Sequence, residues 1–155
     1  MGAMVKRYPK LETENFNTNI PKTVVICTDI FDEFMETNEL LPVALSDADD
    51  ETILKYFLRA SLPASLIDDL MAFFDVVKSP IAVRSSSLLE DSHYQPFAGI
   101  YSTYMIPRLD DKYEMLRLLS DAIKAVYASV FYRDSKGYMT ATSNLIDQEK
   151  MAIVL

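Results

Sequence analysis

The stretch that decides the fold is IAVRSSSLLED at residues 81–91, where a short apolar run leads directly into an arginine and three serines. The apolar run follows a proline and predicts a buried β-strand. From Ser85 to Pro96 no regular period is visible, so we expect a loop there. A strand that delivers Arg84 and three hydroxyl groups into a loop has the composition of an anion-binding site.

Arg84 is the strongest candidate ligand in this stretch. Its guanidinium can donate two parallel hydrogen bonds to a phosphate, and the hydroxyls of Ser85 and Ser86 with loop N–H groups would complete the cradle. Gly99 would let the backbone approach a ligand where a Cβ would obstruct it. The residues alone leave another reading open, in which Arg84 pairs with one of the carboxylates that follow it and the serines form an ordinary turn.

Glycine-rich phosphate loops are excluded. The chain has three glycines, Gly2, Gly99 and Gly137, so neither GxxxxGK[ST] nor GxGxxG occurs.

Periodicity predicts further elements on the N-terminal side. Residues 1–20 are an irregular lead-in that begins with what resembles an expression-tag remnant. The β-branched run 23–27 predicts a strand, and 28–36 a helix with Thr28 and Asp29 as capping candidates. The acidic run 46–51 is better explained as a helix start than as a metal site, because carboxylates favour the positive end of the helix dipole.

Periodicity also predicts elements on either side of the central stretch. Pro63 opens a helix that reaches residue 77, and residues 101–106 alternate as a strand. A long helix is expected from Asp110, capped by Asp110 or Asp111 and followed at its end by Gly137. Residues 151–155 form a last strand. The fold class we expect is therefore α+β, with a mixed sheet of about four short strands backed by about four helices.

Composition limits the partners. The formal charge of −8 argues against a broad nucleic-acid surface, so an anionic ligand must be held by a few local cations. Cys27 is the only cysteine, which excludes an internal disulfide, and we expect it to be buried and inert. No apolar run approaches the roughly 20 residues that cross a bilayer, and no secretory signal opens the chain, so we expect a cytoplasmic protein without a membrane partner.

A spaced pattern within residues 83–104 resembles the N-terminal ATP-binding domain of phosphoenolpyruvate synthases and pyruvate, phosphate dikinases. The pattern is VRSS, three residues, Glu-Asp, five residues, FAG and then a Thr-Tyr strand. Upstream, IPKTVVICTDIF at 20–31 looks like that family's "VP.GF.ITT.AF" segment. Downstream, ASVFYR at 128–133 resembles its "SLFT.R" helix end, and 151–155 the strand before its hinge.

The resemblance implies an ATP-grasp-like fold that closes two subdomains over Mg-ATP. It implies that Arg84 contacts the triphosphate, that Ser85 and Ser86 shape its loop, and that Gly99 with Thr103 belongs to a covering loop. Arg133 is a weaker candidate, because a cation at a helix C-terminus is equally explained by the helix dipole.

The resemblance also implies a larger parent. Residues 21–155 match the first subdomain only, so we expect the parent to continue beyond Leu155 and the isolated chain to be inactive. The parent reaction would convert ATP, pyruvate and water to phosphoenolpyruvate, AMP and phosphate through a phosphohistidine, with magnesium and pyruvate bound by other segments. His93 does not match the phosphohistidine motif, and the family's early "GGK" lysine has no counterpart here.

A second hypothesis remains open at this point, a non-catalytic binding or regulatory module that keeps the fold without the chemistry. An exposed terminal strand would also be a route to a homodimer.

Overall fold

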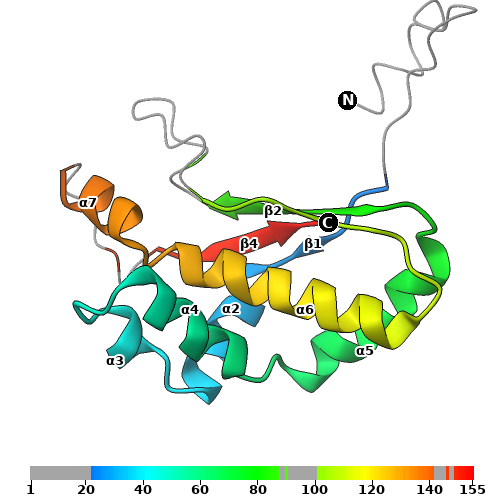
Figure 1. Cartoon of the computed structure of the whole chain (residues 1–155), viewed down its shortest axis with the longest axis horizontal. Coiled ribbons are helices and arrows are strands. Elements are labelled where there is room, and N and C mark those ends of the chain that lie inside the picture. Colours follow the sequence, from blue (N-terminus) through cyan, green and yellow to red (C-terminus); the bar gives the residue numbers. More distant parts are fainter. Residues whose placement is uncertain (1–21, 88–89, 91–100, 142–145, 147–148) are drawn as a thin grey trace, which may run out of the picture.

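A four-stranded sheet forms one layer of the molecule, and helices cover one of its faces (Figure 1). This computed structural model describes residues 22–87, 90, 101–141, 146 and 149–155.

The four strands are joined only by antiparallel pairings, in the spatial order β1-β4-β2-β3. The predicted α+β class is confirmed, but the predicted mixed sheet is wrong. The first two strands do run in the same direction, yet β4 lies between them and pairs antiparallel with both. The strands are β1 (Val25–Ile26), β2 (Ile81–Ser87), β3 (Tyr104–Ile106) and β4 (Met151–Val154).

Strand β2 is longer than the sequence predicts. Ser85 and Ser87 pair with Ile153 and Met151 of β4, so the serines lie in the ladder and not in a loop. The loop expected from Ser85 is therefore wrong at its start. The reason is tertiary, because β4 supplies hydrogen-bond partners that keep polar residues extended.

Six helices are present among the described residues, and the four predicted ones are all confirmed. Two were not predicted, α3 because four residues carry no readable period and α7 because a glycine interrupts it. Gly137 lies inside α7 and does not follow the end of the long helix as expected. The helices are α2 (Thr28–Thr37), α3 (Leu41–Ala44), α4 (Asp50–Arg59), α5 (Ala64–Val76), α6 (Lys112–Ser129) and α7 (Arg133–Ala141).

Aspartate side chains cap two of these helices. Asp49 Oδ1 accepts the N–H of Thr52 at 2.8 Å at the start of α4. Hydrogen bonds from the Thr52 side chain and then from its N–H lower the pKa of Asp49. Asp111 Oδ1 accepts the N–H groups of Tyr113 at 2.8 Å and Glu114 at 3.3 Å at the start of α6. The acidic run is thus a helix start, as the sequence predicts.

Helix α2 begins differently from the prediction. Cys27 occupies its N-cap position without a side-chain hydrogen bond, and Thr28 and Asp29 already lie within the helix. Cys27 is also exposed, not buried as expected, because β1 ends at Ile26 and the chain turns out of the sheet there.

An aromatic cluster holds the helices together beneath the sheet. Phe31 and Tyr127 meet edge to face with ring centroids 5.0 Å apart, and Phe34 packs on Phe57 at 5.9 Å. All four side chains are buried, and each contributes about 1.5–3 kcal/mol through apolar burial. The Tyr127 hydroxyl is buried without a hydrogen-bond partner among the described residues.

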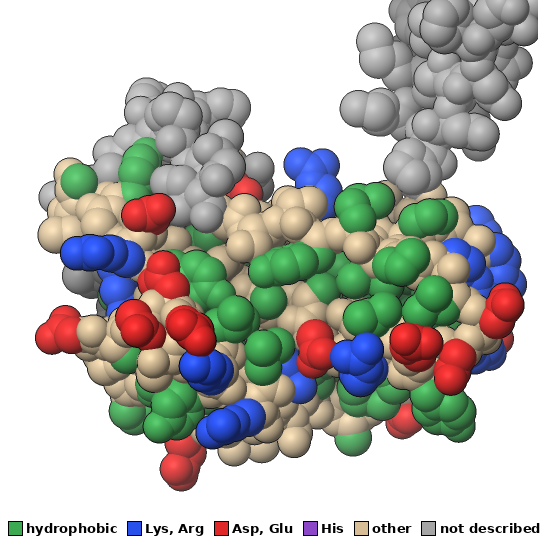
Figure 2. Space-filling model, in the orientation of Figure 1, with side chains coloured by type: hydrophobic (Ala, Val, Ile, Leu, Met, Phe, Trp, Pro, Cys, Tyr) green, Lys and Arg blue, Asp and Glu red, His purple; other side chains and the backbone are tan. Residues whose placement is uncertain are grey.

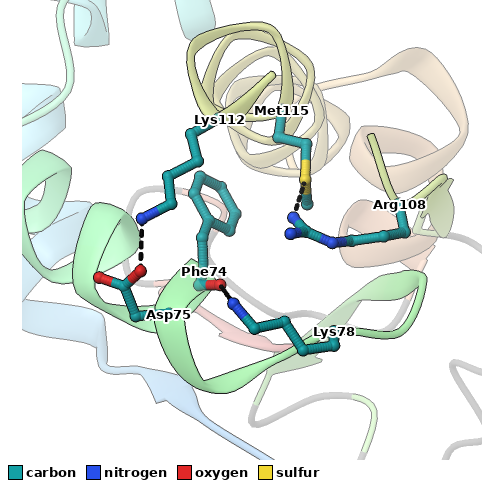
Figure 3. A network of polar contacts seen from close by, with 6 residues as sticks. All are labelled: Phe74, Asp75, Lys78, Arg108, Lys112 and Met115. Carbon is teal, nitrogen blue, oxygen red and sulfur yellow. Dashed lines mark hydrogen bonds and ion pairs between the residues drawn. The ribbon is translucent and has the colours of Figure 1, made fainter. Parts of the chain in front are cut away.

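Side chains also connect the end of α5 to the start of α6 (Figure 3). Lys112 of α6 contacts Asp75 of α5, and this hydrogen bond holds the pKa of Asp75 below its ordinary value. Arg108 donates to the Met115 sulfur at 2.8 Å. The Lys112–Asp75 contact ties the last turn of α5 to the first turn of α6, close to where the chain turns into β2. No helix in the described part of the chain is long and apolar enough to cross a membrane.

Glu39 is the one described non-glycine residue with positive φ, 50°. It follows α2, where Leu40 N donates to Met35 O at 3.1 Å and Glu39 N donates to Glu36 O at 3.2 Å. This pattern is a Schellman cap, which normally places glycine at the left-handed position.

We therefore predict that Glu39→Gly raises the free energy of unfolding by about 1 kcal/mol, because a left-handed backbone is strained for an L-residue with a Cβ. Glu33→Gly, within the exposed face of α2, is the control and should lower it by about 1 kcal/mol. Urea denaturation measures both, and a loss of stability in Glu39→Gly would contradict the argument.

The buried hydroxyl of Tyr127 generates a second prediction. Tyr127→Phe removes an unsatisfied polar group and should raise the free energy of unfolding by about 1 kcal/mol. Tyr101→Phe should lower it, because the Tyr101 hydroxyl donates to Glu149. Destabilisation by Tyr127→Phe in thermal melts would contradict the argument, because it would show that the hydroxyl has a hydrogen-bond partner.

Candidate functional site

The described helices leave one face of the sheet uncovered (Figure 1), and the burial pattern of β2 assigns Arg84 to that face. Side chains alternate along β2, so Ile81 and Val83 are buried toward the helices while Arg84 is exposed. Arg84 pairs with Val154 of β4, whose side chain points to the same face. The strand therefore presents the guanidinium on an open surface.

A groove of about 720 Å³ contains Arg84. The end of α5, the turn after it and strands β2, β3 and β4 form its walls. Two further cations, Lys22 and Lys78, line it with Arg84, and no described Asp or Glu does. Its apolar lining comes from Phe73, Val76, Val77, Pro80, Ile81, Ala82, Met105, Val154 and Leu155.

The absence of carboxylates distinguishes this groove from three others formed by the described residues. On a chain of net charge −8, an anion is repelled least where cations stand alone. Elsewhere both signs are interspersed, as the face in Figure 2 shows. The carboxylates in the other grooves are Asp32, Glu36, Glu39 and Glu149 in one, Asp47, Asp49, Asp50 and Glu51 in the second, and Asp29 and Asp69 in the third.

Lys78 is held in place at this groove. Its ammonium donates to the main-chain carbonyl of Phe74 at 3.0 Å, in the last turn of α5 (Figure 3). The bond satisfies a carbonyl that has no partner within the helix.

The serines after Arg84 divide between the two faces of the sheet. Ser86 lies on the open face with Arg84, whereas Ser85 and Ser87 point toward the helices. Ser85 Oγ donates to Glu90 Oε1 at 2.9 Å, and Ser87 N donates to Glu90 Oε2 at 3.2 Å. Glu90 thus binds the serines, and within the described residues no carboxylate forms an ion pair with Arg84.

A second pair of polar side chains lies beside Ser87. The Tyr101 hydroxyl donates to Glu149 Oε1 at 3.4 Å, and both side chains are buried. Burial, and then the charge of Glu149, raise the pKa of Tyr101 well above its ordinary value. The contact joins the segment before β3 to the entry of β4, 48 positions further along the chain. No local sequence pattern predicts it.

The remaining predicted residues do not gather at the groove. Arg133 is the first residue of α7 and not a helix C-terminus as expected, and it lines the acidic groove at the start of α4, where its N–H donates to Asp50 at 2.8 Å. Thr103 is exposed immediately before β3. Gly99 and His93 lie outside the described residues.

Sequence reasoning missed Lys22 and Lys78. Neither belongs to a phosphate-binding motif, and both reach the groove only because the turn after α5 and the approach to β1 meet beside β2. The one available signal was composition, because Lys and Arg (15) are outnumbered by Asp and Glu (23), so each cation is a candidate ligand for an anion.

Fold and groove together define a class, an α+β domain in which the end of the sheet carries a groove lined, among the described residues, by three cations and no carboxylate. The comparison with known families agrees with this class. The family described as pyruvate phosphate dikinase, AMP/ATP-binding domain, matches residues 2–155. The chain belongs to this family and is an ATP-binding domain of the dikinase type.

The chain is also similar to a curated relative, the uncharacterized phosphotransferase YvkC of Bacillus subtilis (strain 168). The two are 27% identical over 139 residues, which is 88% of this chain and 15% of the relative. The chain therefore spans a small part of that protein.

The two faces of β2 generate a prediction. Ser85→Ala removes the hydrogen bond to Glu90 and should lower the free energy of unfolding by about 1 kcal/mol. Ser86→Ala, on the open face, is the matched control and should change it by less than about 0.5 kcal/mol. Chemical denaturation measures both, and a larger loss for Ser86→Ala would reverse the assignment of faces.

Proposed function

We propose that the cationic groove binds the phosphates of ATP, with Arg84 as the principal ligand. The observation that carries the proposal is its charge, because the described residues that line this groove of an acidic chain include three cations and no carboxylate. An exposed guanidinium without an ion-pair partner among the described residues is available to form two hydrogen bonds to phosphate oxygens.

The rest of the groove suits a nucleotide. Its apolar lining, which includes Phe73 and Met105, offers contact area for a base. Ser86 does not line the groove, but it stands on the same face two positions beyond Arg84, and we propose that its hydroxyl contacts a phosphate that extends past Arg84. Ser85 faces away from the groove, so we assign it an indirect role through Glu90. Thr103, Gly99 and Arg133, which the resemblance also implied, remain candidates that no contact of the described residues supports.

Magnesium fits this groove less well than phosphate does. Mg²⁺ takes oxygen ligands, usually with one or two carboxylates, and none of the described residues that line the groove is a carboxylate. The residues present therefore match the nucleotide and not the metal, and we propose that other segments of the parent hold magnesium.

For the parent we propose a phosphoenolpyruvate synthase-like reaction, in which ATP phosphorylates an enzyme histidine and the phosphate then passes to pyruvate. The open face of the sheet supports an ATP-grasp-like arrangement, since a second subdomain would close over it. Phosphoryl transfer needs an in-line acceptor and neutralised charge as well as a bound phosphate. The isolated chain supplies only the last of these, so we expect binding without turnover.

Calorimetric titration of the chain with Mg-ATP tests the proposal. Wild type should bind weakly, and Arg84→Ala should weaken binding at least about tenfold, since a hydrogen bond to a charged group contributes about 1.5–3 kcal/mol. Arg59→Ala removes a cation that does not line the groove and should leave binding within about twofold.

Equal Mg-ATP affinities for wild type and Arg84→Ala would show that Arg84 does not bind the phosphates, and would contradict a phosphate site in this groove. No binding at millimolar ATP would favour a module that keeps the fold without binding the nucleotide by itself.

A further inference from the structure

We infer that Lys78 is a second phosphate-binding residue of the groove, acting with Arg84. This inference rests on the proposed function. It concerns a residue in the turn between α5 and β2, outside the VRSS stretch that points to Arg84.

Position is the first support. Lys78 is exposed and lines the same groove as Arg84. It lies in the turn before β2, whereas Arg84 lies within that strand. Asp75 at the end of α5 feels the charge of Lys78, but its hydrogen bond and ion pair are with Lys112 (Figure 3), so the Lys78 ammonium has no ion-pair partner among the described residues.

Hydrogen bonding is the second support. A lysine ammonium has three donors, and one of them is used on Phe74 O. The bond restrains a long side chain at the groove, so less conformational freedom is lost when a phosphate binds. Two donor positions remain for a ligand.

The position of α5 gives Lys78 a further effect. The C-terminal end of a helix carries a partial negative charge, which repels a phosphate. Lys78 covers this end where it meets the groove, because its ammonium bonds a carbonyl of the last turn. Loss of the ammonium would both remove a cation and expose a repulsive helix end.

The test compares two lysines that make the same kind of contact. Lys124 donates to Leu58 O at 3.2 Å, in the last turn of α4, but does not line the groove. Lys78→Met and Lys124→Met therefore each remove one charge and one bond to a helix carbonyl. The ligands are Mg-ATP, tripolyphosphate and adenosine, titrated by calorimetry, with thermal melts to verify folding.

Lys78→Met should weaken binding of Mg-ATP and of tripolyphosphate by about five- to tenfold, and leave adenosine binding unchanged. Lys124→Met should stay within about twofold of wild type for every ligand. Lys78→Arg, which keeps the charge, should recover most of the loss. The difference between Lys78→Met and wild type should also shrink at high salt.

Two results would overturn the inference and leave the proposed function intact. One is an unchanged affinity in Lys78→Met while Arg84→Ala loses binding. The other is an equal loss in Lys78→Met and Lys124→Met, which would indicate a general effect of net charge. If wild type binds neither Mg-ATP nor tripolyphosphate, the proposed function fails, and this inference fails with it.

Discussion

The antiparallel pairing of β2 with β4 is the constraint on which the rest of the structure depends. It extends β2 through Ser87, and by doing so it fixes which side chains point to which face. Val83 and Ile153 enter the core on one side, while Arg84 and Val154 share the other. A shift of one residue in this register would bury the guanidinium and expose the core, so the same hydrogen bonds that complete the sheet also place Arg84 on its open face.

Among the helices, α5 contributes to the groove, and it does so through its C-terminal end. α5 ends at Val76, and its contacts with α6 determine how the chain enters β2. That turn brings Lys78 beside the strand that carries Arg84. The groove is therefore a product of packing between distant segments, although each of its walls is a simple element.

Local patterns predicted the parts of this fold that local physics determines. The four strands, the four longer helices and the cap at Asp111 follow from periodicity and capping chemistry. The exposure of Arg84 beside a cationic groove agrees with its place in a short motif, and its role as a ligand stays a prediction. Where the prediction was wrong, a distant partner decided the outcome. Ser85 is in a strand because Ile153 pairs with it, and its hydroxyl is turned away from Arg84 by the alternation of that strand. Lys78 was not identifiable, because nothing in its neighbours along the chain reports which groove it will line.

The order of the strands has a consequence for how the chain folds. β4 is the last strand in the sequence but occupies an interior position, between two strands that precede it by more than 60 residues. Until residues 151–154 are in place, β1 and β2 have no common neighbour, and their inner edges stay unpaired. Such non-local closure is slow compared with helix formation, and unpaired edges invite association with other chains. Synthesis on the ribosome would therefore leave the sheet open until its final strand has emerged, with the helices already formed around an unfinished core.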